Sequence, residues 1–287
     1  MRVSIISSVT VGASTGAGSV ERSALAVREV LDRSGIDNGE VGLLLNTGIH
    51  RDENIVEPAI AALIQKKAGI NLQYHGQRAP ALSFDIMNGP CGFLDAVQVA
   101  AVTGPHKVVI VAGEGHPSRT EHPDFPYLTS AAAVVVGPSP DDAAGFGPVY
   151  RARTTAPDKP LAYMPLATMG TEGVRVLGLD QPEEAALERG LDIATEVVVR
   201  CLEQEGLDPA DCVLLAGEPR AGFAKTVATA AGIDEVHTPG TPADPHSAAL
   251  PFAYRAWLAA EPRGRARHAL FLAADGHFVA ACAPYGL

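Results

Sequence analysis

The feature that most constrains the fold is a long-period duplication of strand and helix patterns. In the first half, an apolar strand pattern over Leu43–Gly48 precedes a helix pattern that starts near Pro58. In the second half, Val213–Gly217 precedes a helix pattern that starts near Pro219. Both helix patterns end in the same Ala-Gly-Ile step, at Ala68–Ile70 and Ala231–Ile233. Two copies are too few for a solenoid, and alternating strands and helices favour mostly parallel sheets covered by helices.

Apolar periodicity predicts the other elements of an α/β protein. The expected strands are Val3–Val9, Val41–Thr47, Ala81–Ile86, Lys107–Ala112, Ala131–Val136, Val149–Thr154, Cys212–Ala216, Glu235–His237, His268–Ala273 and His277–Pro284. The expected helices are Glu21–Ser34, Glu57–Ala68, Cys91–Val102, Glu183–Glu205, Pro219–Ala231 and His246–Ala259. We predict a first half over residues 1–140, connecting loops rich in Pro, Gly and Asp over 141–180, and a second half over 181–287.

Charge and patterning exclude several classes of protein. The formal net charge of -11 argues against nucleic-acid binding, which needs a basic surface. No apolar run approaches the roughly 18 residues that cross a membrane, and the first ten residues lack the basic start of a signal peptide. We therefore expect a cytoplasmic protein with no membrane partner.

The four cysteines show no metal-binding or disulfide spacing. Cys201, Cys212 and Cys282 lie inside apolar patterns, which predicts buried, inert thiols. Cys91 instead begins its helix in the first half, as His246 begins the matching helix in the second. If those helices pack near the axis of the duplication, the thiol and the imidazole come close together at two helix N-termini. A helix N-terminus stabilises a thiolate, so Cys91 is either a nucleophile or a small packed residue.

Four segments of the chain resemble the β-ketoacyl-ACP synthase III branch of the thiolase superfamily. The nucleophile segment of that family is similar to Ser83–Leu94 (SFDIMNGPCGFL), where a strand ending in Phe-Asp leads to a cysteine and then Gly-Phe. The other similar segments are Lys107–Arg119, Tyr127–Gly137 and Phe271–Phe278. The resemblance implies a thiolase-like fold, in which two βαβαβαββ halves form a layered αβαβα sandwich. It also implies a homodimer or a heterodimer with a paralogue, acyl-CoA or acyl carrier protein as substrate, no permanently bound cofactor, and a role in fatty acid or polyketide biosynthesis.

The chain departs from the family's pattern at each catalytic position. Counted from Phe84-Asp85, the family's cysteine falls at Pro90, and Cys91 comes one residue later. The family's His-Gln-Ala-Asn signature falls near Leu215–Arg220, where no histidine stands. The asparagine turn has become Asp244–Ser247 and the glycine turn Asp275–His277. These changes introduce His246 and His277, which are candidate bases or hydrogen-bond donors, or else histidines satisfied by nearby backbone.

Three functions remain open on the sequence. The leading hypothesis is a ketoacyl-synthase-III-like acyltransferase, in which Cys91 takes an acyl group and His246 or His277 assists its transfer to an unknown acceptor. The alternative is a catalytically degenerate partner subunit of a heteromeric complex, with the helix Glu57–Ala68 and the loop Ile49–Val56 at the interface. A third hypothesis is an acyl-CoA-binding protein that forms no covalent adduct.

Other candidate sites are weaker. We expect a flexible loop at Gly12–Gly18, a helix-cap charge at Glu218, and no metal at His116, His122 and Asp124. The basic residues Arg263, Arg265 and Arg267 are either solvated or a docking site for an acidic carrier protein or a CoA phosphate.

Overall fold

The structure is a computed structural model. It describes residues 2–13, 17–52, 57–72, 80–104, 106–117, 122–155, 161–163, 177–260 and 266–287. Among the expected features, Arg263, Arg265, residues 14–16 of the glycine-rich segment, residues 53–56 of the candidate interface loop and residues 118–119 of the similar segment lie outside these ranges.

The first sheet has five strands in the order β1-β5-β4-β2-β3. The strands are β1 (Val3–Val11), β2 (Val41–Asn46), β3 (Leu82–Asp85), β4 (Lys107–Glu114) and β5 (Ser130–Pro138). β2 pairs in parallel with β3 and β4, whereas β5 pairs antiparallel with β4 and β1. Almost every residue of β4 and β5 is buried, as expected for strands covered on both faces.

The second sheet repeats this order as β11-β10-β12-β13-β6, with β7 also paired to β13. The strands are β6 (Gly145–Phe146), β7 (Tyr150–Arg153), β10 (Cys212–Ala216), β11 (Glu235–His237), β12 (His268–Ala274) and β13 (Val279–Gly286). β10 is parallel to both of its neighbours, and β13 is antiparallel to β12. The correspondence of β2, β4 and β5 with β10, β12 and β13 confirms the duplication predicted from the sequence.

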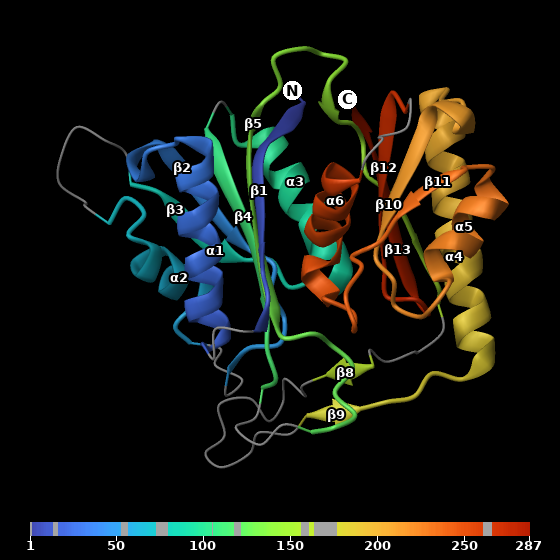
Figure 1. Cartoon of the computed structure of the whole chain (residues 1–287), viewed down its shortest axis with the longest axis horizontal. Helices are drawn as coiled ribbons and strands as arrows, with labels where there is room; N and C mark the ends of the chain where they lie inside the picture. The colour runs from blue at the N-terminus through green and yellow to red at the C-terminus, as the bar shows by residue number, and fades with distance from the viewer. Residues whose placement is uncertain are drawn as a thin grey trace.

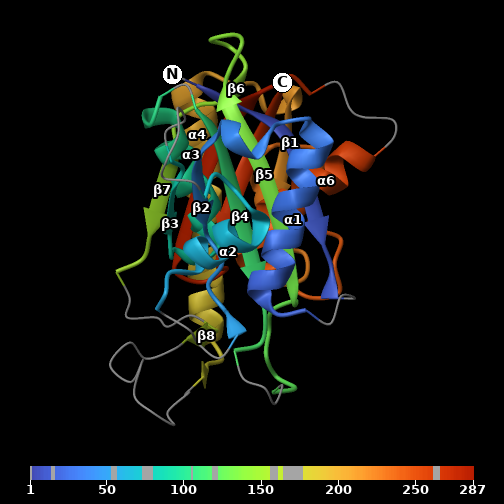
Figure 2. The ribbon, with the colours of Figure 1, turned by 90° about the vertical axis from the view of Figure 1, so that its left-hand side faces the viewer.

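The helices form three layers around these sheets. They are α1 (Ser19–Ser34), α2 (Ile60–Ala68), α3 (Gly92–Val102), α4 (Glu184–Glu205), α5 (Phe223–Ala231) and α6 (Ala249–Ala259). Figure 1 shows α3 and α6 between the sheets, with α1 and α2 outside the first sheet and α4 and α5 outside the second. Figure 2 shows α1 and α2 across the outer face of the first sheet. This is the predicted αβαβα sandwich.

Three apolar cores hold the layers together. The central core joins inward residues of both sheets to α3 and α6, through Phe93, Leu250 and Trp257 among others. The second core packs α1 and α2 on the first sheet, and the third packs α4 and α5 on the second. In the described part of the chain, no helix combines the length and the apolar character needed to span a bilayer.

Among the helices that begin later than the sequence predicted, α2 and α5 each have a local cause. α2 begins at Ile60 because the Asp85 carboxylate, at the end of β3, accepts hydrogen bonds from the N–H groups of Ile60 and Ala61. α5 begins at Phe223, after Gly222 in a left-handed conformation with φ of 80°. Both helices end as predicted, at Gly69 and Gly232.

The range 141–180 was expected to consist of connecting loops apart from a strand over Val149–Thr154. That strand is present as β7, and further short strands accompany it. β6 and β7 extend the second sheet by pairing with β13. β8 (Ala162–Tyr163) and β9 (Gly178–Leu179) form a separate two-stranded sheet. The Pro, Gly and Asp content of this range concealed β6, β8 and β9, which pairing with other strands stabilises. The division of the chain into the halves 1–140 and 181–287 stays a prediction.

Candidate active site

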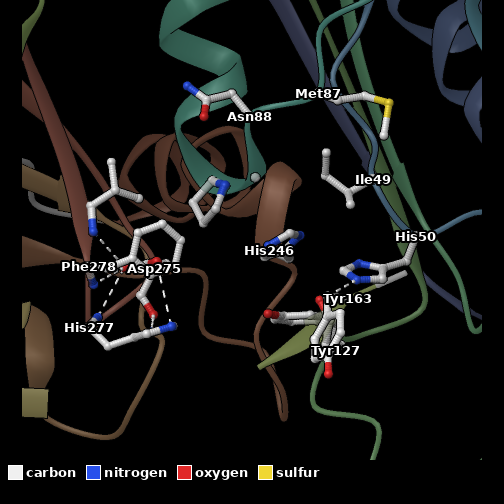
Figure 3. Close-up of a pocket in the computed structure, with 14 residues that line it drawn as sticks. Ile49, His50, Met87, Asn88, Tyr127, Tyr163, His246, Asp275, His277 and Phe278 are labelled. Carbon is white, nitrogen blue, oxygen red and sulfur yellow. Dashed lines mark hydrogen bonds and ion pairs between the residues drawn. The ribbon is translucent and has the colours of Figure 1, made fainter. Parts of the chain in front are cut away.

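A pocket of about 320 Å³ lies where the two halves of the fold meet. Figure 3 shows the labelled side chains around it. The lining residues come from the loop after β2, the turn before α3, the segment before β5, the strand β8, the turn before α6 and the turn between β12 and β13. They are Ile49, His50, Met87, Asn88, Gly89, Pro90, Tyr127, Ala162, Tyr163, His246, Asp275, His277, Phe278 and Val279. Two predicted site residues, His246 and His277, line this pocket, whereas Cys91 does not.

Two short 3-10 turns face each other across the junction of the halves. The turn Gly89–Cys91 leads into α3, and the turn His246–Ala248 leads into α6. A Cβ atom built on Gly89 would lie 3.5 Å from His246 Nε2. The predicted proximity of the two helix N-termini is therefore confirmed, with the imidazole next to the turn that precedes α3.

The Cys91 side chain belongs to the central core. Its residue is 1% exposed and it packs in the cluster that contains Phe93. Burial raises the pKa of the Cys91 thiol to about 12, and the carboxylates of Asp275 and Asp95 add to the shift. A thiol in this environment is protonated at neutral pH, which weighs against reaction. The assignment of Cys91 as a nucleophile stays a prediction.

His246 is held in one orientation by its backbone and by Glu114. The residue has φ of 50°, in the left-handed region that non-glycine residues seldom adopt. Its ring Nδ1 lies 3.1 Å from Glu114 Oε1, and its ring centroid lies 4.1 Å from that of Tyr127. In the described part of the chain, no hydrogen bond uses its Nε2, which points toward Gly89. The imidazole therefore presents one nitrogen to the pocket and one to a carboxylate.

Glu114, the last residue of β4, is the centre of the polar network beneath the pocket. Its carboxylate is fully buried and lies 2.9 Å from His50 Nδ1. It also accepts the N–H groups of Ile49 at 3.2 Å and His50 at 3.0 Å, and the hydroxyl of Ser247 at 2.5 Å. His50 Nε2 in turn lies 3.3 Å from the Ala162 carbonyl oxygen, in the pocket wall. This carboxylate thus joins the loop after β2 to the turn before α6.

Electrostatics couple the Glu114 carboxylate to the His246 imidazole. Burial alone would raise the pKa of Glu114, but the charges of His246 and His50, and hydrogen bonds from both rings, hold it well below its ordinary value. Burial alone would lower the pKa of His246, but the Glu114 charge and hydrogen bond raise it, with smaller contributions from Asp244 and Asp275. At neutral pH the carboxylate is ionised, so Nδ1 of His246 is the donor to it.

His50 and Glu114 were not predicted as site residues from the sequence. Glu114 ends an otherwise apolar strand pattern, KVVIVAGE, and a charged residue in a buried strand is itself a signal of a paired group. His50 follows β2 and becomes recognisable only when the fold brings it to Glu114.

The cluster of His50, Glu114 and His246 also has the composition of a metal site. Their candidate ligand atoms lie within 4.8 Å of one another, and two histidines with one carboxylate form a known ligand set. The hydrogen bonds do not fit a metal, because the carboxylate lies between the two Nδ1 atoms and accepts donors at both oxygens. Elsewhere in the described residues, His116, His122 and Asp124 form no such cluster, and His116 Nε2 accepts the His122 N–H at 2.8 Å.

The turn between β12 and β13 carries His277 and Asp275. His277 Nδ1 lies 3.1 Å from the Asp275 carbonyl oxygen, and its Nε2 lies 3.8 Å from Asp275 Oδ2.

Glu218 lies outside this pocket, where its carboxylate accepts the Ala224 N–H at 3.4 Å near the start of α5, consistent with a cap-region charge. The three other cysteines are buried, as expected.

Comparison with solved structures decides the fold. A Xanthomonas campestris OleA variant with bound lauric acid and lauroyl-CoA matches with a TM-score of 0.76 at 17% identity, over 100% of this chain and 99% of that one. The 3-oxoacyl-[acyl-carrier-protein] synthase III of Aquifex aeolicus matches with a TM-score of 0.79 at 14% identity, over 99% and 100%. The fold is that of the ketosynthase III enzymes. The priming β-ketosynthase of a polyketide pathway also matches, with a TM-score of 0.74 at 16% identity over 100% and 96%. No family model and no curated protein matches the sequence.

Within the ketosynthase III fold, the one-residue offset of the cysteine has a structural consequence. Pro90, where the sequence resemblance places the family's cysteine, lines the pocket, while Cys91 lies in the core. The strand β10 ends at Ala216, and Gly217 follows where the sequence comparison expected the family's histidine region. The polar groups of this pocket are therefore a different set, carried by the loop after β2, by β4 and by the turns at His246 and Asp275.

Proposed function

We propose that this chain is an acyltransferase that binds an acyl thioester, of CoA or of an acyl carrier protein, in this pocket and passes the acyl group directly to an acceptor. The observation that supports the proposal is the orientation of the His246 imidazole. Its Nδ1 lies against a buried carboxylate, and its Nε2 points toward Gly89 in the pocket wall. An imidazole oriented by a carboxylate in this way is suited to general base catalysis.

The proposed transfer requires no covalent intermediate on the protein. His246 Nε2 takes a proton from the acceptor as the acceptor's nucleophilic atom attacks the thioester carbonyl carbon. The carbon–sulfur bond then breaks, and the leaving thiolate becomes a thiol by taking a proton. Thioester and acceptor are thereby converted into acylated acceptor and free thiol. Glu114 orients the ring and stabilises the imidazolium that forms during the attack.

Release of free thiol from a panel of acyl-CoAs, in the presence of small acceptors that carry a hydroxyl or an amino group, tests this function. We expect wild-type protein to release CoA above the spontaneous rate, and His246→Gln to lower that release by about 10²–10⁴-fold, the usual contribution of a general base. The exposed His122→Gln serves as the matched control, with activity equal to wild type. Equal activity of His246→Gln and wild type would contradict the proposed base.

Intact mass spectrometry of the same reactions separates the direct route from the route through Cys91. An acyl-sized mass gain that disappears in Cys91→Ala would establish the covalent route. Thiol release without a mass gain is expected for direct transfer.

A second candidate function is the catalytically degenerate partner subunit. The observation that favours it is the burial of Cys91, whose thiol pKa of about 12 opposes nucleophilic attack. In that case the chain alone would neither bind nor consume acyl-CoA. Turnover would then appear only on mixing with an active paralogue, and it would survive His246→Gln.

We also propose that a second copy of this chain docks on the edge of the first sheet. β3 is the edge strand, and the apolar side chains of Leu82, Phe84 and Met87 near it are 67%, 40% and 48% exposed. An open edge strand with apolar side chains is a template for pairing, and pairing β3 with its own copy gives a closed two-fold dimer.

Light scattering after size exclusion tests this dimer. Wild-type protein is expected to have the mass of a dimer, and Leu82→Lys/Phe84→Lys that of a monomer, because two lysines on the edge oppose pairing. Val102→Lys, at a position 82% exposed at the end of α3, is the control and should remain dimeric. A monomeric wild-type protein, or a dimeric double variant, would exclude this interface.

A further inference from the structure

The turn between β12 and β13 brings a carboxylate to the pocket that the transfer chemistry above does not use. Asp275 Oδ1 accepts hydrogen bonds from the N–H groups of His277, Phe278 and Val279, each at 3.0 Å. Figure 3 shows this set of bonds on one side of the pocket. The three bonds fix the direction of the side chain, so the second oxygen, Oδ2, has a defined place.

Asp275 Oδ2 is a buried acceptor without a donor. The side chain is 9% exposed, and within the described residues no group donates a hydrogen bond to Oδ2. The nearest ring nitrogen, His277 Nε2, is 3.8 Å away, which is beyond hydrogen-bond distance. A buried carboxylate oxygen without a donor costs free energy, and a ligand that brings a donor recovers it.

His246 Nε2 is a second acceptor in the same pocket. Because Nδ1 donates to Glu114, Nε2 carries a lone pair once the pH exceeds the raised pKa of the ring. The charged and titratable groups that face His246 are Glu114, Asp244, Asp275, His50 and Tyr127. Of the three carboxylates, Asp275 lines the pocket and favours a cation there, whereas burial raises the pKa of Asp244 and Glu114 is already bonded to both histidines.

We propose that Asp275 Oδ2 and His246 Nε2 bind the primary ammonium group of the acyl acceptor, so that the product of transfer is an amide. This inference rests on the acyl transfer proposed above. An ammonium group brings three N–H donors, which can serve Asp275 Oδ2 and His246 Nε2. It also brings a positive charge, which pairs with the Asp275 carboxylate. A hydroxyl brings one donor and no charge, so it leaves one of the two acceptors unsatisfied.

The proposed step balances without a further reactant. His246 Nε2 takes one proton from the ammonium, and the freed lone pair of the amine attacks the thioester carbonyl carbon. The carbon–sulfur bond breaks, and the leaving thiolate takes a second proton from the nitrogen. Acyl-CoA and ammonium are thereby converted into amide, free CoA and one proton, which leaves His246 for solvent.

Competition between n-butylamine and n-butanol for butyryl-CoA tests the inference. We expect N-butylbutyramide to form at least about tenfold faster than the butyl ester, since a charged hydrogen bond contributes that much or more. Asp275→Asn keeps an oxygen for the three N–H groups and replaces Oδ2 with a donor. We expect it to raise the KM for butylamine by about 10–100-fold, while the exposed Asp192→Asn in α4 matches wild type. Nα-acetyl-lysine amide, used as the acceptor in place of butylamine, mimics a lysine side chain of a protein. Faster acylation of this compound than of butylamine indicates a protein side chain as the acceptor, and the reverse indicates a free amine.

Each outcome decides a separate point. Consumption of butyryl-CoA with no preference for the amine would overturn the ammonium site and leave acyl transfer standing. If no acceptor releases CoA, the acyl transfer fails, and calorimetry with butylammonium chloride on the same proteins decides the site. Weaker binding to Asp275→Asn than to wild type would support the site, and equal or absent binding would overturn it. If Asp275→Asn does not fold, the affinity of wild type for butylammonium over butanol decides in the same way.

Discussion

Pro90→Cys is expected to give a protein that takes up an acyl group covalently from acyl-CoA, about 100-fold or more faster than wild type. Pro90 lines the pocket and stands where the ketosynthase III pattern has its cysteine. The turn that holds it leads directly into α3, so a thiolate at this position would be stabilised by a helix N-terminus. Wild-type Cys91 has neither advantage, because its side chain is packed in the core.

The new thiol would also lie next to a base. A Cβ on the neighbouring Gly89 would be 3.5 Å from His246 Nε2, so the imidazole is within reach of a side chain on this turn. Adding His246→Gln to the variant should therefore slow acylation by about 10²-fold or more. The measurement is intact mass against time with butyryl-CoA, followed by peptide mapping of the modified residue.

Two companion variants make the Pro90→Cys result specific. Pro90→Ser controls for loss of the proline ring, because it presents a weaker nucleophile at the same place. Pro90→Cys/Cys91→Ala must retain the adduct if residue 90 carries it. A folded Pro90→Cys protein that binds butyryl-CoA but gains no mass would show that the thioester carbonyl does not approach this turn.

The fold was predictable from sequence because its signals are local and repeated. The strand and helix over Leu43–Ala68 have the same order and the same glycine step as those over Val213–Ala231. Each half must bury one face against the other, so the repeated pattern leads to a layered sandwich. The starts of α2 and α5 were not predictable, since they depend on the Asp85 carboxylate and on the conformation of Gly222.

The site was only partly predictable, because it is assembled from distant segments. His246 and His277 were found from their places in two turns, and both line the pocket. Glu114 and His50 lie 64 residues apart in sequence, and no pattern of spacing indicates their contact. The direction of the Cys91 side chain was equally hidden, because a shift of one residue in a turn moves a side chain from the pocket wall into the core.

Glu114→Gln is expected to lower the free energy of unfolding by about 3–5 kcal/mol, the usual cost of removing one partner from a buried ion pair. The carboxylate accepts hydrogen bonds at both oxygens, and an amide offers one acceptor and one donor group instead. The amide nitrogen would therefore oppose other donors in a fully buried site. Urea unfolding measures the loss. Glu196→Gln, which breaks an exposed pair between Glu196 and Arg200, should cost less than about 0.5 kcal/mol.

The difference between wild type and Glu114→Gln should depend on pH in a defined direction. The pKa of Glu114 is lowered, so its contribution is present above its ordinary value of 4.5 and is lost as pH falls through the lower, folded-state pKa. The pKa of His246 is raised, so its contribution is present below its ordinary value of 6.5 and is lost as pH rises through the higher, folded-state pKa. The stability difference should therefore be greatest between these two ordinary values and decrease at higher pH.

The same experiment distinguishes the ion pair from a metal site. A metal held by His50, Glu114 and His246 would make wild-type stability sensitive to a chelator, because binding to the folded state alone raises its stability. We expect EDTA to leave the urea midpoint of wild type unchanged, while Glu114→Gln lowers it. A chelator effect as large as that of the substitution would assign the network to metal binding, and the His246 base would then lose the carboxylate that orients it.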